Sequence, residues 1–119
     1  FGLAGHALEL ARGAGVSVTI DWGRVPLLDG VETLVADGFV TGASARNWDG
    51  YGAQVDLAGD LPATARALVT DPQTSGGLLV SCAPGSVDAV LGIFRDEGFA
   101  DAAVIGRVDA GPAGLHVAR

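Results

Sequence analysis

The sequence predicts an α+β fold, an α/β sandwich in which helices pack on a mixed β-sheet. Two observations lead to this prediction. Segments with apolar residues three or four positions apart, typical of helices, are interspersed with short apolar or alternating segments, typical of strands. In addition, 49% of the 119 residues are hydrophobic, which is enough for a core in one domain spanning residues 1–119.

The N-terminal residues predict a helix followed directly by a strand. Residues 1–13 repeat apolar side chains at the spacing of one helical face, and Gly13 and Gly15 end the pattern. Residues 16–20, VSVTI, alternate apolar and polar side chains, as a strand with one buried face does. A second helix is expected after Asp29, which can cap its first turn.

A long loop is expected over roughly residues 41–52, TGASARNWDGYG. Loops longer than about 12 residues without structure of their own are uncommon and often functional. Asn47 and the aromatic residues beside it give this loop chemical variety, although an ordinary surface loop with a docked aromatic ring remains an alternative. A short strand is expected over residues 53–57.

The second half of the chain predicts two helices and three strands. A helix over residues 61–70 follows the capping residue Asp60 and ends before Pro72, because the residue before a proline avoids helical backbone angles. GLLVSC, residues 77–82, is a continuous apolar run that predicts a strand buried on both faces. The remaining expected elements are a helix from Pro84 or Ser86 to Gly98 and strands over residues 103–108 and 115–118.

The composition excludes several function classes. With 14 acidic residues, 7 arginines and no lysine, the chain carries a net charge of −7 and lacks the positive surface of a nucleic-acid-binding protein. It contains no long uncharged apolar run and no basic N-terminal segment, so neither a membrane span nor a signal peptide is expected. Any phosphate chemistry is left to arginine, backbone amides, a metal ion or another part of the protein.

The cysteine and histidine residues indicate no metal site. Cys82 is the single cysteine, which fits a reducing cytoplasm, and its apolar neighbours predict a buried side chain. His6 is expected to be a partly buried structural residue, and His116 to point away from the core. The acidic residues Asp96, Glu97 and Asp101 are expected to face water.

Residues 71–77, DPQTSGG, are the strongest candidate site. Gly76 and Gly77 allow the backbone to adopt positive φ and turn its N–H groups to one side, which forms a nest for an anion. Thr74 and Ser75 add hydroxyl donors, and Asp71 is placed to cap the turn or face a metal ion. The segment is no Walker loop, because it lacks GK[ST] and precedes a strand. A purely structural turn is the alternative.

Several stretches together resemble one family. FGLAGH at 1–6, VPLL at 25–28, GASARN at 42–47 and above all DPQTSGGLLVS at 71–81 are similar, in order and spacing, to selenophosphate synthetase (selenide, water dikinase). That family belongs to the aminoimidazole ribonucleotide synthetase-like superfamily. The resemblance covers essentially the whole chain but only the C-terminal domain of the enzyme, so the predicted fold is that of this domain.

The resemblance implies an enzyme that converts ATP, selenide and water into selenophosphate, AMP and phosphate, with Mg²⁺ and a monovalent cation. It implies a cytoplasmic homodimer of two-domain subunits. The family's nucleophilic Cys or selenocysteine, its essential lysine and its magnesium-binding aspartates belong to the N-terminal part. We therefore carry over no catalytic or metal-binding residue, and expect this chain alone to be inactive and to bind none of these cofactors by itself.

The chain opens on Phe1 and contains no methionine, so we expect it to be a piece of a longer protein whose own N-terminal domain is its partner. The resemblance places Asn47, Thr74, Ser75, Gly76 and Gly77 near the cleft between the two domains, facing that domain or the phosphates of the nucleotide. No catalytic role follows for any of them.

Two other readings remain. The chain can belong to another ATP-using member of the superfamily, such as a thiamine-phosphate kinase or a purine-pathway synthetase, which would release ADP. It can also be a stand-alone binding or dimerisation module without chemistry. DPQTSGG favours the selenophosphate synthetase reading.

Overall fold

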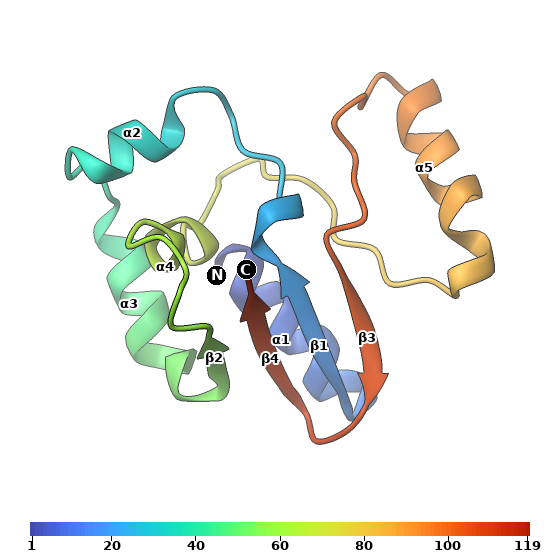
Figure 1. Cartoon of the computed structure of the whole chain (residues 1–119), viewed down its shortest axis with the longest axis horizontal. Coiled ribbons are helices and arrows are strands. Elements are labelled where there is room, and N and C mark those ends of the chain that lie inside the picture. Colours follow the sequence, from blue (N-terminus) through green and yellow to red (C-terminus); the bar gives the residue numbers. More distant parts are fainter.

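Four strands form one mixed sheet in the computed structural model, which describes all residues from 1 to 119. The strand order is β2-β4-β1-β3. β1 runs parallel to β4 and antiparallel to β3, and β2 runs parallel to β4. Helices pack on this sheet, which confirms the α+β fold (Figure 1). The strands are β1 (Val16–Asp21), β2 (Val55–Leu57), β3 (Gly106–Ala110) and β4 (Gly114–Ala118).

The chain forms five α-helices. The first of them lies across one face of the central strands (Figure 1). The helices are α1 (Gly2–Ala14), α2 (Val31–Ala36), α3 (Gly42–Tyr51), α4 (Ala65–Val69) and α5 (Val87–Asp96). Single 3₁₀ turns cover Trp22–Arg24, Gly52–Gln54 and Pro84–Ser86.

The core lies between α1 and the sheet. Small side chains at Ala4, Ala7 and Ala11 let the helix approach closely, and Leu8 between them is fully buried. The alternating residues of β1 and β4, including Ile20 and Val117, supply the opposite wall. The predicted helix at 1–13 and strand at 16–20 are therefore confirmed, and Gly15 ends α1 in the left-handed conformation.

Two predicted helix starts are wrong. α2 begins after Gly30 rather than at a capping Asp29, and no side chain caps it. α4 begins only at Ala65, after Thr64, so Asp60 does not cap it. The intervening residues instead form turns, in which the Ala65 N–H donates to the Pro62 carbonyl. A carboxylate near a helix start is common in sequences, and only the backbone path decides whether it can reach the first N–H groups.

The loop predicted over 41–52 is also wrong, because these residues form α3. Thr41 caps the helix, its Oγ1 accepting from the Ser44 N–H at 3.3 Å. Two glycines and many polar residues hid the helical pattern. Tertiary packing overrides this weak propensity, since Ser44 and Tyr51 are buried against the rest of the chain.

The predicted buried strand at 77–82 does not form. Residues 71–83 contain neither helix nor strand, and Leu78 is 81% exposed. Cys82, expected to be buried, is exposed as well. An apolar run predicts burial only when the chain supplies a surface to cover it. Here the neighbouring α5 stands away from the sheet (Figure 1), and no strand pairs with the run.

The C-terminal elements agree better with the sequence. α5 forms as expected, but none of its residues is fully buried, and Phe94 packs edge to face with Phe99 at a centroid distance of 6.3 Å. The strand expected over 103–108 begins only at Gly106, which lies so close to β1 that a Cβ there would clash with the Thr19 carbonyl. The last strand, β4, matches the expected 115–118.

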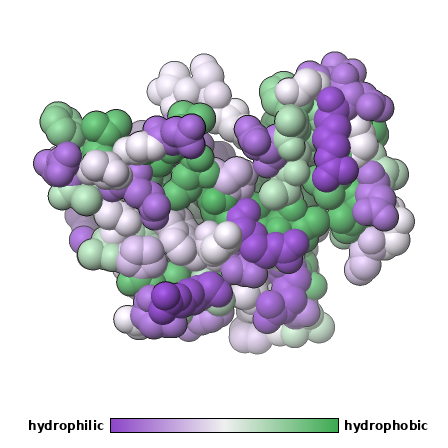
Figure 2. Space-filling view, turned by 45° about the horizontal axis from the view of Figure 1, so that its top comes forward, coloured by the Kyte–Doolittle hydropathy of each residue, from purple (hydrophilic) through white to green (hydrophobic).

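Large apolar side chains are exposed in two separate parts of the chain, and apolar residues are visible on the face drawn in Figure 2. No helix of the structure has the length and apolar character needed to cross a membrane. The exposed large hydrophobic residues in the region of α2 are Leu27, Leu28, Leu34, Phe39 and Val40, and those in the C-terminal half are Leu78, Val80, Ile93, Phe99 and Val108.

Candidate functional site

The three sequence motifs at 1–6, 42–47 and 71–77 meet around Thr70 and Asp71, where α4 ends. α1 brings the first motif, α3 the second, and the chain leaving α4 begins the third. The resemblance placed Asn47 and residues 74–77 near one cleft, but the sequence gave no sign that Gly2 and Thr70 contact the same region. The structure therefore defines a candidate site at this junction.

One face of α3 forms hydrogen bonds to the end of α4 at this junction. The N-cap Thr41 and the helix residues Ser44 and Asn47 are spaced three apart and so lie along one side of the helix. Asn47 Nδ2 donates to the Thr70 carbonyl oxygen at 2.9 Å, and Thr41 Oγ1 donates to Asp71 Oδ1 at 3.3 Å. Asn47 is thus next to the start of the 71–77 loop, held by a structural hydrogen bond.

A buried pair of hydroxyls completes the junction. Thr70 is almost fully buried, and its Oγ1 donates to the Arg66 carbonyl at 2.7 Å. Ser44 Oγ lies within hydrogen-bonding distance of this hydroxyl and of the Ala67 carbonyl. No buried side-chain oxygen or nitrogen is left without a partner. Sequence reasoning missed Ser44 and Thr70, although the three-residue spacing of Thr41, Ser44 and Asn47 was the available signal.

The backbone conformation at position 2 explains why the first motif has glycine there. Its φ of 74° is in the left-handed region, which favours glycine. A Cβ there would also lie 2.7 Å from the carbonyl carbon of Thr70 and 2.7 Å from the carbonyl oxygen of Val69. Only glycine lets the start of α1 approach the end of α4 this closely.

The 71–77 loop is exposed beyond Pro72. The left-handed backbone expected at Gly76 and Gly77 occurs instead at Gln73 and Ser75, with φ of 45° and 63°. The Gly76 N–H donates to the Gln73 carbonyl at 2.9 Å and closes a turn that displays Thr74 and Ser75 to solvent. Left-handed backbone at non-glycine residues costs about 1–3 kcal/mol and is found preferentially at functional sites.

A hollow of about 470 Å³ adjoins this region between α1 and α3. His6, expected to be partly buried, is exposed and lines it together with Arg46 and Asn47. Tyr51 forms part of its wall and donates to the carbonyl of Phe1. Burial raises the pKa of the Tyr51 phenol, and a hydrogen bond with the Gly5 backbone acts in the opposite direction.

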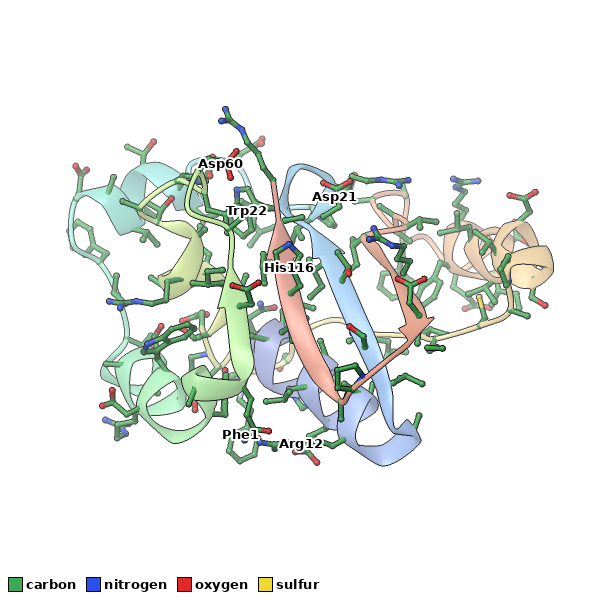
Figure 3. All side chains as sticks on the ribbon, turned by 60° about the horizontal axis from the view of Figure 1, so that its bottom comes forward. Phe1, Arg12, Asp21, Trp22, Asp60 and His116 are labelled. Carbon is green, nitrogen blue, oxygen red and sulfur yellow. The ribbon has the colours of Figure 1, made fainter.

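The other titratable candidates lie apart from this region. His116 is on the sheet face opposite α1 (Figure 3), where its Nδ1 lies 2.8 Å from Asp56 Oδ2. Its expected orientation away from the core is confirmed, although it is only half exposed. Asp96, Glu97 and Asp101 face water, as expected.

No group of three or more His, Cys, Asp or Glu side chains is placed to hold a metal ion. Asp71, expected to cap the turn or face a metal ion, accepts a hydrogen bond from Thr41 Oγ1. The donor set that magnesium requires is several oxygen ligands converging on one point.

Comparison with known proteins defines the class of this fold and site. Residues 1–117 match the family described as AIR synthase related protein, C-terminal domain. The chain belongs to this family. Its α+β architecture, with helices on a mixed four-stranded sheet, is consistent with that membership.

Individual relatives show which members of this family the chain is similar to. The chain is 61% identical over 117 residues to "Selenide, water dikinase" of Burkholderia pseudomallei (strain K96243), covering 98% of this chain and 33% of the relative. It is 59% identical over 111 residues to the protein of that name from Pseudomonas straminea, covering 93% and 31%. The resemblance indicated by the motifs is confirmed. The chain spans about a third of the length of these curated relatives.

Proposed function

We propose that this chain is the C-terminal domain of an enzyme that makes selenophosphate from ATP, selenide and water, with AMP and phosphate as the other products. The observation that carries the proposal is the identity of 61% to a curated "Selenide, water dikinase" over 98% of the chain. The full-length protein would be a cytoplasmic homodimer, and it would use Mg²⁺ and a monovalent cation.

The residues present support a division of labour between two domains. The chain has no lysine, and no carboxylate cluster placed for a metal ion. A missing nucleophile, lysine and metal site would therefore come from the N-terminal part of the same protein. The exposed apolar residues in two separate parts of the chain favour such a partner, because isolated soluble domains rarely expose large apolar patches.

Within that enzyme, Asn47 and residues 74–77 would lie near the interdomain cleft. Three features favour this position. The loop displays the hydroxyls of Thr74 and Ser75, its backbone is held in left-handed geometry, and Asn47 ties α3 to its base. Such a loop would position the partner domain or the nucleotide phosphates and leave the bond-breaking steps to the other domain.

Ser75→Ala in the full-length enzyme tests the role of this loop. We expect lower turnover without unfolding, because the exposed hydroxyl contributes nothing to the core. Turnover with ATP and selenide would be measured beside the thermal midpoint of each protein. Ser81→Ala, at another exposed position of the same irregular region, is the matched control and should leave turnover unchanged. Unchanged kinetics in Ser75→Ala would assign the loop a structural role only.

The identity of the nucleotide product separates this function from the other enzymes of the superfamily. Release of AMP supports the selenide, water dikinase assignment. Release of ADP would assign the protein to a kinase or synthetase that cleaves ATP once.

A further inference from the structure

β3 is the outer strand of the sheet, and its free edge is exposed (Figure 1). Within the sheet it pairs with β1 alone. The residues from Arg107 to Ala110 are exposed, and Val108 is 45% exposed. An unpaired edge presents N–H and C=O groups that can extend the sheet into another chain. β3 is therefore a surface to which a further strand can add.

The ladder with β1 determines which backbone groups of β3 point outward. The Asp21 N–H donates to the Ile105 carbonyl at 2.8 Å, and these two residues continue the register of the strands. Hydrogen-bonded and non-hydrogen-bonded pairs alternate along an antiparallel ladder. Every second residue from Ile105 therefore directs its backbone groups toward β1. The residues between them direct theirs to the free edge, namely Gly106, Val108 and Ala110.

The side chains of β3 place its charges on one face of the sheet. Arg107 is in the same cross-strand row as His116, so Arg107 and Asp109 lie on the face opposite α1 (Figure 3). Arg107 Nε donates to Asp109 Oδ2 at 2.9 Å, which keeps the two charges side by side. Val108 is in register with the core residue Val18, so it lies on the other face.

We propose that β3 pairs antiparallel with β3 of a second copy of this chain, centred on Val108. In this register Arg107 of each copy is opposite Asp109 of the other, so both cross-strand charge pairs are attractive. These are non-hydrogen-bonded pairs, in which opposite side chains approach most closely. The outward backbone groups at positions 106, 108 and 110 are all paired, and the two Val108 side chains bury exposed surface.

The charges select this register over its neighbours. A shift of two residues in one direction places Arg107 opposite Arg107, and a shift in the other direction places Asp109 opposite Asp109. Like charges directly opposite each other are destabilising. A shift of one residue would oppose outward backbone groups to inward ones. The strand is thus complementary to itself, which favours a second copy over an unrelated extended peptide. Only residues of this chain take part, so the pairing does not depend on the proposed function.

Two charge-reversed variants test the pairing. Sedimentation of the 119-residue chain over a concentration series should show a reversible monomer–dimer equilibrium. Arg107→Asp and Asp109→Arg each place like charges opposite each other, so each should weaken dimerisation by about tenfold or more. An equimolar mixture of the two variants has opposite charges at both pairs again, and should regain the lost affinity. Arg95→Asp, the same charge change on exposed α5, is the matched control and should leave dimerisation unchanged.

Val108→Pro tests the contribution of the backbone. The N–H that this substitution removes points to the free edge, where proline is tolerated in an edge strand. We expect the variant to keep the amide spectrum of the folded chain and to lose dimerisation. The mixture of charge variants tests the same interface without a change of backbone.

Three results would overturn the proposal. One is a chain that stays monomeric up to a concentration of about 1 mM, equivalent to a binding free energy weaker than about 4 kcal/mol. A second is a dimer that Asp109→Arg leaves intact, or single variants whose mixture dimerises no better than either alone, because the interface then lies elsewhere. The third is slow hydrogen exchange at the Gly106, Val108 and Ala110 amides of the dilute monomer, which would mean that another segment of the same chain covers this edge.

Discussion

At the residue scale, the hydroxyl of Thr70 holds the segments of the candidate site together. It is buried where three motifs meet and hydrogen-bonds to the Arg66 carbonyl and to Ser44. Thr70→Val keeps the shape but removes the hydroxyl, and leaves Ser44 with one partner fewer. We expect the free energy of unfolding to fall by about 1–3 kcal/mol, measured by urea denaturation.

Thr74→Val is the matched control for this substitution. Thr74 is exposed in the turn, so the same chemical change should alter the free energy of unfolding by no more than about 0.5 kcal/mol. Equal effects of the two substitutions would show that the junction around Thr70 does not hold the fold together as the hydrogen bonds indicate.

Tyr51 gives the chain a distinctive alkaline titration. Burial raises its phenol pKa above the ordinary value of about 10, so the folded chain holds this proton more tightly than the unfolded chain. The corresponding stability is fully present below pH about 10 and is lost as the pH rises through the folded-state pKa. The chain has one tyrosine and no lysine, so few other groups titrate there.

The ultraviolet absorbance of the tyrosinate measures this ionisation directly. We expect its midpoint to lie at higher pH in the folded chain than in the chain unfolded by urea. Tyr51→Phe, which cannot ionise, should lose the corresponding decline in stability. Identical midpoints in the folded and unfolded chains would contradict the burial of the phenol.

At the element scale, the sequence predicted the elements whose pattern is set by their own buried face. α1, β1 and β4 place regularly spaced apolar residues against one another, so their periodicity was sufficient. α3 was missed because its stabilising contacts are polar and tertiary, made by Ser44 and Asn47 to the end of α4. The run at 77–82 was misassigned because apolar composition cannot show which surface covers it.

α5 differs from the core elements in how much of its apolar face is buried. Ile93 on α5 is 65% exposed, whereas Ile20 on β1 is 2% exposed. Ile20→Ala should lower the free energy of unfolding by about 2–5 kcal/mol, because it leaves a cavity in the core. Ile93→Ala should change it by no more than about 0.5 kcal/mol. Chemical denaturation of both variants checks this, and a large loss for Ile93→Ala would mean that α5 packs on the sheet in solution.

The candidate site was predictable from sequence only in part. The motif at 71–77 indicated a turn with hydroxyl groups, and the structure has one, which is exposed. The location of the left-handed residues was wrong, because Gly76 is used for a close approach to the Gln73 carbonyl while Ser75 takes the positive φ. The convergence of Gly2, Asn47 and Thr70 required the structure, since these residues are far apart in the chain.

At the scale of the whole molecule, the chain resembles a part of an enzyme that works with a second part. It spans about a third of its curated relatives, has exposed apolar residues in two separate parts and contains no metal-binding cluster. The proposed function therefore predicts that catalysis needs the full-length protein, while this chain supplies a folded wall of the cleft.

The most direct measurement is a nucleotide-product assay of the full-length protein containing this segment, with ATP and Mg²⁺, in the presence and absence of selenide. The 119-residue chain alone is assayed beside it. We predict AMP from the full-length protein only when selenide is present, and no turnover by the chain alone. ADP, no product from the full-length protein, or selenide-dependent turnover by the chain alone would contradict it.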